Sequence, residues 1–204
     1  MSEFNTQELQ ASYGIGLQMG DQLKSQPFEG LDVSAVAAGI ADAFEGAEHK
    51  VSRQDLEAAF QTISASMQKA SDEQAKLLGA AGAEFLAENA KKESVKVTDS
   101  GLQFEVLTEG EGDTPTAEST VSVHYHGTLI DGTVFDSSVD RGQPAEFPVG
   151  GVIAGWTEAL QLMPVGSKYK LTIPADLAYG ERGAGASIGP HSTLVFEVEL
   201  LEIK

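Results

Sequence analysis

The apolar residues of this chain change their spacing near Ser94, and this change constrains the fold more than any other feature. Before Ser94 they recur every three or four positions, as on one face of an α-helix, and after it they alternate with polar residues, as in a half-buried β-strand. We therefore predict an α+β protein with a helical domain over residues 1–94 and an antiparallel sheet domain over residues 95–204. A chain of 204 residues is long enough for two such domains.

The helical half contains a seam of apolar residues at nearly heptad spacing. The seam runs from Leu56 to Phe85, and a capping sequence that starts at Ser52 precedes it. A helix of about 40 residues spans about 60 Å, and the two shorter helices before it are too small to enclose a core with it. We therefore expect a homodimer through residues 1–60. The alternative is that the seam packs on the sheet domain.

Glycines interrupt both the first helix and the long helix. Gly14, Gly16 and Gly20 each cost about 1 kcal/mol in a helix interior, so we expect close contact between helices there. A dinucleotide-binding loop is the weaker interpretation, because no strand precedes these glycines and their spacing is wrong. Gly79 and Gly82 in the long helix are interpreted as points of bending.

Apolar and polar residues alternate in four runs of the second half, which is typical of an antiparallel sheet covered on one side. The runs cover residues 102–106, 121–126, 168–173 and 194–200. The pair Asp131-Gly132 predicts a tight turn between two strands. A short helix after Trp156 supplies Ala159, Leu160 and Met163 to cover the apolar face of the sheet.

Composition excludes several classes of site and partner. The chain has no Cys, which excludes disulfides, thiolate zinc sites and thiol catalysis. Its net charge of -18, without a stripe of Lys or Arg, argues against nucleic acid as a partner. No apolar run is long enough to span a membrane, and Met1–Asn5 lack the basic and apolar features of a secretory signal. We therefore expect a cytoplasmic protein that does not bind a membrane.

Two histidines, His124 and His126, lie two residues apart in a predicted strand and so share one face. Such a pair suggests a metal site, but no third ligand stands nearby at a usual spacing, and we expect exposed strand histidines instead. We therefore expect neither a metal nor another cofactor.

The stretch from Gly150 to Trp156 contains the only Trp of the chain. An indole at the start of a short helix is usually part of a core, since one ring buries on the order of 200 Å². The alternative is the floor of a shallow aromatic pocket, with a backbone N–H of Val152 or Ile153 free at its rim. The motifs around this stretch favour the pocket when they are read together.

These motifs lie in a fixed order along the second half. They are Val123-His124-Tyr125-His126-Gly127, Gly132-Thr133-Val134-Phe135-Asp136-Ser137-Ser138, Val152-Ile153-Ala154-Gly155-Trp156, Leu162-Met163-Pro164-Val165-Gly166, Ile173-Pro174, Ala178-Tyr179-Gly180 and Leu194-Val195-Phe196-Glu197-Val198-Glu199-Leu200. In order and spacing they resemble the FKBP-type peptidyl-prolyl cis/trans isomerases, from about Gly101 to the C-terminus. The first half, with Ala11-Ser12-Tyr13-Gly14-Ile15-Gly16, resembles the dimeric bacterial subfamily of macrophage infectivity potentiators and their cytoplasmic relatives. This resemblance implies a V-shaped dimer joined through the N-terminal helices, with the long helix as a stalk.

The same resemblance assigns the residues of the site. It implies catalytic roles for Asp136, Tyr179, Phe135, Trp156 and Phe196. It implies substrate binding by Tyr125, Arg141, Phe147, Val152, Ile153 and Ile188, with the N–H of Ile153 as a donor to a substrate carbonyl. Ala145 stands where eukaryotic relatives often carry an aromatic residue, so we expect a wider rim, which leaves the affinity for macrolides open.

By this resemblance the chain accelerates the rotation of X–Pro bonds in unfolded or partly folded polypeptides, and macrolides such as rapamycin inhibit it. The reaction makes and breaks no bond, so it needs no nucleophile, and an apolar pocket favours the less polar twisted amide. The cleft of the V would hold a client chain, as in a folding chaperone, and residues 95–204 alone would act on peptides. The alternative is a chaperone or scaffolding module that binds proline-containing clients with little turnover.

Overall fold

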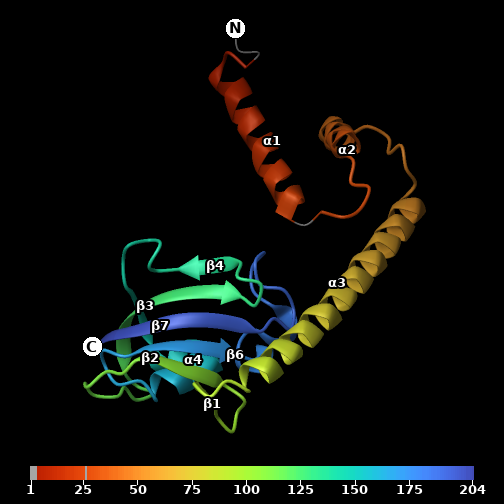
Figure 1. Ribbon diagram of the computed structural model, residues 1–204. Coiled ribbons are helices and arrows are strands. Elements are labelled where there is room, and N and C mark those ends of the chain that lie inside the picture. The colour runs from red at the N-terminus through yellow and green to blue at the C-terminus, as the bar shows by residue number, and fades with distance from the viewer. Residues whose placement is uncertain (1–3, 26) are drawn as a thin grey trace. The chain divides into compact units, whose positions relative to one another are not determined.

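The computed structural model describes residues 4–25 and 27–204 (Figure 1). Helices fill the first part of the chain, and a sheet with short helices fills the second, so the predicted α+β class is confirmed. The segment predicted to form the dimer, residues 1–60, includes residues 1–3 and 26, which lie outside the described residues.

The chain divides into two compact units, and the boundary between them falls between Ala70 and Ser71. That boundary lies inside the long helix α3, Arg53–Asn89. The first unit therefore contains the N-terminal part of α3, and the second unit contains its C-terminal part. The domain boundary predicted between residues 94 and 95 stays a prediction.

Two helices of the first unit begin at well-formed caps. Besides the start of α3, the unit holds α1, Gln7–Ser25, and α2, Val33–Glu45. The carboxylate of Asp32 accepts hydrogen bonds from two backbone N–H groups at the start of α2. The hydroxyl of Ser52 accepts the backbone N–H of Asp55 at 3.1 Å, which confirms the cap predicted for the long helix.

The first unit does not enclose a core. Neither α1 nor α2 contains a buried residue. Outside α1 itself, no heavy atom among the described residues lies within 4 Å of the position that a Cβ would take at Gly14, Gly16 or Gly20. The close helix contact predicted for these glycines is therefore not made within one chain. Among the described residues no helix is long and apolar enough to cross a bilayer.

The second unit is built on a seven-stranded sheet in the order β1-β2-β6-β7-β3-β4, with β5 paired to β3. Every pairing is antiparallel. The strands are β1, Val95–Val97, β2, Gln103–Thr108, β3, Thr120–Leu129, β4, Val134–Ser137, β5, Ala145–Pro148, β6, Lys168–Ile173, and β7, Leu194–Ile203. The predicted Asp131-Gly132 turn joins β3 to β4, where Gly132 has a φ of 88° and its N–H donates to the carbonyl of Leu129 at 3.0 Å.

Helix α4, Ala154–Leu160, covers one face of this sheet. Ala159 and Leu160 are each 1 % exposed, so they cover the apolar face as predicted. A Cβ added at Gly155 would lie 2.5 Å from a side-chain carbon of Ile173, which shows how closely the helix approaches β6. Complete burial of a Leu side chain contributes about 1.5–3 kcal/mol, and this layer forms the core of the unit.

Three 3-10 helices flank the core elements. They are η1, Val149–Gly151, just before α4, and η2, Ala175–Leu177, and η3, Gly180–Arg182, which both lie between β6 and β7. The segment between β6 and β7 also contains Tyr179 and Ile188, two of the predicted site residues.

Helix α3 covers one part of the other face of the sheet, next to β2 and β6, which the prediction of one covered side did not include; the rest of that face is half-exposed, as at Lys168 and Glu197. The side-chain amide of Asn89 in α3 donates to Gln103 at 2.9 Å and to Thr172 at 3.3 Å, and Gln103 donates to the carbonyl of Leu86 at 2.9 Å. All three polar side chains are buried. Their polar pattern resembles that of a solvated face. They can nevertheless be buried, because they form hydrogen bonds with one another beneath α3.

Not every residue of the apolar seam faces the second unit. Leu77, which belongs to the seam, is 72 % exposed. The seam therefore does not pack on the sheet domain at this position, and a neighbouring stripe of α3 does so instead.

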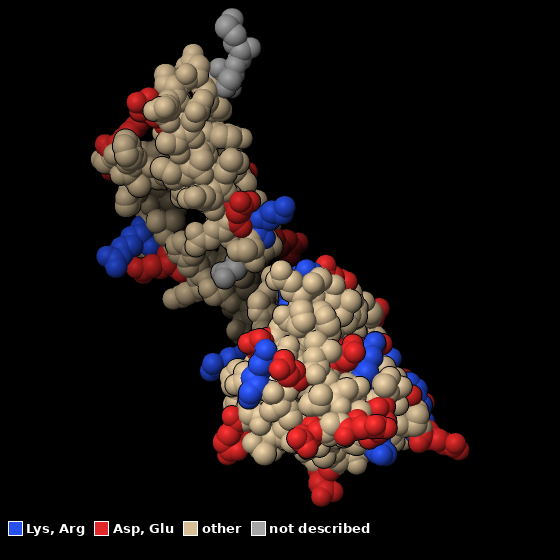
Figure 2. All heavy atoms as spheres, turned by 90° about the vertical axis from the view of Figure 1, so that its left-hand side faces the viewer, with Lys and Arg blue, Asp and Glu red and all other residues tan. Residues whose placement is uncertain are grey.

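Charged side chains are distributed over both units. On the face shown in Figure 2, Lys and Arg are scattered among Asp and Glu and do not gather into a stripe. In the same view the first unit presents a broad surface that is free of charged side chains.

Candidate active site

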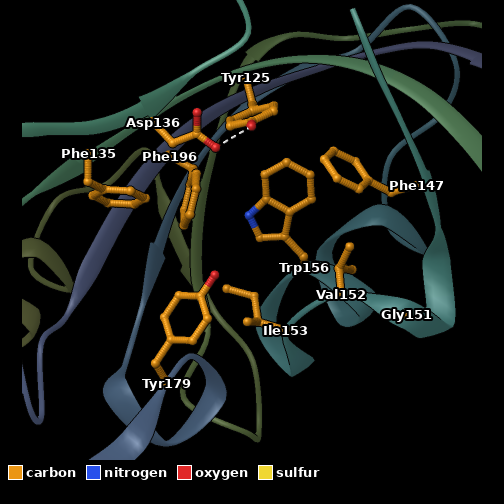
Figure 3. Close-up of a pocket in the computed structure, with 10 residues that line it drawn as sticks. All are labelled: Tyr125, Phe135, Asp136, Phe147, Gly151, Val152, Ile153, Trp156, Tyr179 and Phe196. Carbon is orange, nitrogen blue, oxygen red and sulfur yellow. Dashed lines mark hydrogen bonds between the residues drawn. The ribbon is translucent and has the colours of Figure 1, made fainter. Parts of the chain in front are cut away.

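A cavity of about 500 Å³ opens in the second unit, above the start of α4 (Figure 3). Its walls are mostly aromatic and aliphatic. The lining residues are Tyr125, Phe135, Asp136, Phe147, Gly151, Val152, Ile153, Trp156, Tyr179 and Phe196. All the predicted site residues except Arg141 and Ile188 are among them, and Gly151 is an addition.

Trp156 forms the floor of this cavity. The indole is 4 % exposed and packs edge-on against Tyr125, Phe147 and Phe196, with ring centroids 5.4, 5.8 and 5.3 Å away. Its N–H is buried and has no hydrogen-bond partner among the described residues. Figure 3 shows the nitrogen on the edge of the indole that faces Phe196, whose ring is a weak acceptor. The indole is thus both part of the core and the base of the pocket.

Phe135 and Phe196 form one wall, and a glycine permits their position. The two rings are perpendicular, with centroids 5.4 Å apart. Gly127 in β3 lies beneath both, and an added Cβ there would come within 2.8 Å of each ring. Gly127 is not among the predicted site residues, although a glycine inside an alternating strand signals a close approach.

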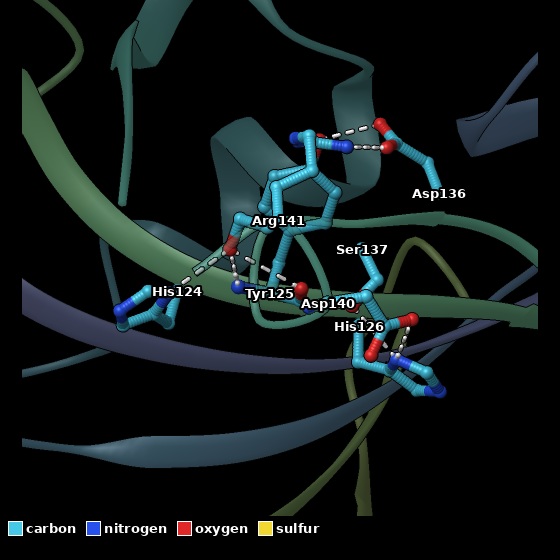
Figure 4. Close-up of polar contacts among 8 residues, drawn as sticks. His124, Tyr125, His126, Asp136, Ser137, Asp140 and Arg141 are labelled. Atoms are coloured by element: carbon cyan, nitrogen blue, oxygen red, sulfur yellow. Dashed lines mark hydrogen bonds and ion pairs between the residues drawn. The ribbon is translucent and has the colours of Figure 1, made fainter. Parts of the chain in front are cut away.

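A polar cluster closes the rim of the pocket (Figure 4). The hydroxyl of Tyr125 and the guanidinium of Arg141 both donate to the carboxylate of Asp136. Arg141 also donates to the Tyr125 hydroxyl at 2.8 Å and lies 5.6 Å from the centre of the Tyr125 ring. Arg141 therefore acts behind the lining, on residues that belong to it.

This cluster sets the charge state of its members. Partial burial pushes the pKa of Asp136 upward, but the hydrogen bonds from Tyr125 and Arg141 and the positive charge of Arg141 together outweigh it and hold that pKa below its ordinary value. Burial, assisted by the hydrogen bond to Asp136, raises the pKa of Tyr125. At neutral pH the cluster therefore contains a carboxylate, a neutral phenol and a guanidinium.

His124 and His126 support the strand that carries Asp136. Their Nδ1 atoms lie 3.1 Å from the hydroxyl of Ser138 and 3.0 Å from the hydroxyl of Ser137, respectively. Both histidines are half-buried, so the expectation of exposed strand histidines is wrong. The reason is that the chain just after Asp136 folds back over β3 and brings the two serines to them. No cluster of three metal-binding side chains occurs in the described part of the chain.

Two potential donors at the pocket have no hydrogen-bond partner among the described residues. The backbone N–H of Ile153 donates to no other described residue. Tyr179 stands at the mouth and is 41 % exposed. Figure 3 shows its hydroxyl directed into the cavity, toward Ile153 and Phe196. These are the two groups that a bound peptide could reach as hydrogen-bond donors.

Ile188 lies beside this pocket, on a second groove. It is 8 % exposed and shares the groove with Phe135, Asp136 and Tyr179, which also line the main cavity. The structure thus brings Ile188 next to the site, although it does not line the main cavity itself.

Comparisons with known proteins agree with this geometry. Residues 112–201 match the family described as FKBP-type peptidyl-prolyl cis-trans isomerase, and residues 8–106 match the domain amino terminal to it. The chain is 60% identical to the FKBP-type 22 kDa peptidyl-prolyl cis-trans isomerase of Escherichia coli strain K12, over 98% of this chain and 97% of that protein. The chain belongs to the FKBP-type peptidyl-prolyl cis-trans isomerases.

Two further relatives also match nearly the whole chain of this FKBP-type isomerase. The outer membrane protein MIP of Legionella longbeachae is 41% identical, over 100% of this chain and 88% of that protein. The crystal structure of FkpA from Escherichia coli is 38% identical and superimposes with a TM-score of 0.71, over 98% of both chains. The predicted family, fold class and enzyme class are confirmed. The roles assigned to individual site residues stay predictions.

Proposed function

We propose that this isomerase turns X–Pro bonds in the aromatic cavity above Trp156. The observation that carries the proposal is the composition of the cavity, with an indole floor, aromatic walls and its charged cluster at the rim. The barrier to rotation is about 18–20 kcal/mol because the planar amide has partial double-bond character. A twisted amide loses that resonance and becomes less polar, so an apolar site binds it better than the planar form.

The aromatic floor and wall would hold the proline ring. Trp156 and Phe196 meet edge-to-face, and Phe135 packs on Phe196 in the same way, so together they offer an apolar surface for the small proline ring. The N–H of Ile153 and the hydroxyl of Tyr179 would donate to carbonyl groups of the peptide on either side of the ring. Each tenfold acceleration needs about 1.4 kcal/mol, so two such hydrogen bonds and desolvation together supply several factors of ten.

Asp136 would orient the pocket and would not act as a base. No proton moves in the reaction, and the carboxylate is already bonded to Tyr125 and Arg141. Both partners fix the rim next to the place where the residue before proline would lie. Removal of the carboxylate would release Tyr125, which is also part of the lining.

A second copy of the chain is the proposed partner of the first unit, through residues 1–60. The described helices of this unit expose many large apolar side chains and bury none of their own in α1 or α2. Those exposed by more than half include Tyr13, Ile15, Leu17, Val33, Phe44 and Phe60. A surface of this kind in one small unit supports association, and the spacing of the glycines in α1 suits helices of two chains in close contact.

The clients would be unfolded or partly folded polypeptides that contain proline, and two catalytic units in one dimer would hold such a client by avidity. This is a chaperone-like addition to the enzyme activity. We propose the cytoplasm as the location of the protein. Because one relative carries the name outer membrane protein MIP, this location needs a test, which is fractionation of cells with an antibody against the chain.

The first test is isomerisation of a short X–Pro peptide by the full chain, with and without rapamycin, together with Asp136→Ala. Fast turnover that falls with the drug and with the substitution would support the cavity as the catalytic site. Binding of rapamycin without turnover would favour a module that binds proline-containing clients. Turnover that neither the drug nor the substitution changes would place the activity outside this cavity.

A further inference from the structure

One face of α3 between Ala75 and Asn89 lies against the second unit. The buried and half-buried residues in this part of α3 follow one stripe at intervals of three and four, while the residues between them are exposed. The stripe consists of Ala75, Leu78, Gly79, Gly82, Phe85, Leu86 and Asn89. The hydrogen bonds from Asn89 to Gln103 and Thr172 fix the C-terminal end of this stripe to the sheet.

The N-terminal part of the stripe, from Leu78 to Gly82, packs against the segment that leads into β7 (Figure 1). A Cβ added at Gly82 would lie 2.5 Å from Oγ1 and 3.2 Å from Cβ of Thr193. A Cβ added at Gly79 would lie 3.5 Å from Cβ of His191. A Cβ added at Gly189 would lie 2.7 Å from Cδ1 of Leu78. Gly82 therefore permits a close approach to Thr193, whereas a side chain at Gly79 would make only an ordinary contact. The bending predicted for both glycines stays a prediction.

This segment is cross-linked into one body by its own hydrogen bonds. The N–H of His191 donates to the carbonyl of Gly180 at 2.9 Å, and Ala184 and Ile188 exchange two backbone bonds of 2.8 and 3.1 Å. The hydroxyl of Ser192 donates to the carbonyl of Gly189 at 2.8 Å. We define residues 179–193 as the rim segment, because it begins at Tyr179 in the pocket mouth and ends at Thr193 under α3.

We propose that Gly82 and Leu78 of α3 are positioning residues for the rim segment, and that they set the placement of Tyr179 and Ile188 at the pocket. The proposal rests on the assignment of the cavity as the catalytic site. Because the rim segment is cross-linked between its two ends, a displacement at Thr193 reaches the pocket mouth. The C-terminal half of α3 is thus a supporting wall of the active site as well as a connection between the units.

A matched pair of full-length variants tests this. Gly82→Ala and Gly79→Ala make the same chemical change on the same face of the same helix, but the new Cβ has only 2.5 Å at Gly82 and an ordinary 3.5 Å at Gly79. A misplacement of about 1 Å lowers an enzymatic rate by up to about 100-fold. We expect Gly82→Ala to lower kcat/KM about tenfold and to change the order of preference among peptides that differ in the residue before proline. We expect Gly79→Ala to leave both unchanged.

The rescue variant is Gly82→Ala combined with Thr193→Ala, which removes the Oγ1 atom at 2.5 Å. Restored activity and restored peptide preference in the double variant, with Thr193→Ala alone close to wild type, would support positioning through this contact. Gly82→Ala with wild-type rates and preference would overturn the proposal. A wild-type chain without turnover would instead remove the proposed function, so the two failures are distinguishable.

A second pair covers the case in which Gly82→Ala does not fold. Leu78→Ala removes the side chain next to Gly189, and Leu77→Ala truncates its neighbour, which is 72 % exposed. We expect Leu78→Ala to lower kcat for the peptide series while its thermal unfolding shows a fully folded protein at the assay temperature. Equal kinetics of the Leu78 and Leu77 variants would overturn the proposal.

Discussion

Tyr125 and Asp136 are joined by a hydrogen bond across the β3–β4 hairpin, and the phenol is the donor. Arg141, five residues after Asp136, donates to both partners. A side chain of the core is in this way connected to a charged pair at the surface. The rim of the pocket is therefore held by one network, and its parts are expected to respond together to substitution.

Asp136→Asn keeps the shape of this side chain but removes its charge. The hydrogen bonds to charged groups are the stronger ones, so we expect Tyr125 to lose its fixed position and kcat/KM for an X–Pro peptide to fall about tenfold, which corresponds to about 1.4 kcal/mol. Tyr125→Phe, which removes only the donor, is expected to give a smaller loss. A peptide assay with both variants checks this, and a larger effect of Tyr125→Phe would contradict the central place of Asp136.

The depressed pKa of Asp136 predicts how pH affects the cluster. A carboxyl group whose pKa is lower in the folded than in the unfolded state stabilises the fold above the unfolded value and loses this contribution as pH falls through the folded value. The ordinary value is 3.8. We therefore expect the difference in melting temperature between wild type and Asp136→Asn to be constant from pH 7 to about pH 5 and to shrink below 3.8. A difference that shrinks already between pH 7 and 6 would show that another group controls it.

Gly127→Ala is expected to disturb the pocket more than the fold. The added Cβ would come within 2.8 Å of the rings of both Phe135 and Phe196, and one of them must move. Overpacking typically costs about 1–3 kcal/mol, so the protein should remain folded, while kcat/KM falls by more than tenfold. Peptide kinetics and thermal unfolding of the same sample separate the two effects, and normal kinetics in a folded variant would show that the wall tolerates the methyl group.

Much of the second unit was predictable from the sequence because its strands have one buried face each. The alternating runs placed β2, β3, β6 and β7, and the Asp131-Gly132 pair placed the hairpin turn. The aromatic residues of the site were assigned through their resemblance to a family, since each of them alone is more typical of a core. Tyr125 or Arg141 was expected as the partner of Asp136, and the structure joins all three side chains in one network.

The sequence was misleading where polar residues are buried. Gln103 and Thr172 read as a solvated face, but Asn89 covers them. The contact of Gly82 with Thr193 could not be read from the sequence, and the bending predicted there stays a prediction. The spacing of apolar residues indicates which faces of a helix or strand are apolar. It does not indicate whether the polar residues of another face are buried and hydrogen-bonded to one another beneath a helix. Contacts of this kind depend on residues that are far apart in the chain, such as Asn89 and Thr172.

Tyr179 provides a test of the hydrogen bond proposed for the reacting peptide. Its hydroxyl has no partner among the described residues and points into the cavity. We expect Tyr179→Phe to lower kcat about tenfold with little change in KM, because a bond formed mainly in the twisted state contributes to the rate and not to ground-state binding. Steady-state kinetics with a peptide of high solubility give both constants. A rise in KM at constant kcat would instead assign the hydroxyl to binding of the planar peptide.

The first unit predicts a dimer that depends on the apolar surface of α1. Ile15 is 60 % exposed in one chain, and Glu at this position would place a charge in the proposed interface, once from each copy. Burial of one Ile contributes about 1.5–3 kcal/mol, so two copies make the dimer weaker by about 100-fold or more.

The control is Gln10→Glu, which adds the same charge on the opposite side of α1. In analytical ultracentrifugation at micromolar concentration, wild type and Gln10→Glu should sediment as dimers and Ile15→Glu as a monomer. Because the pocket lies in the other unit, Ile15→Glu should keep its rate on a short peptide and refold a proline-limited protein more slowly. A monomeric wild-type chain under these conditions would disprove the dimer and, with it, the role of avidity in holding clients.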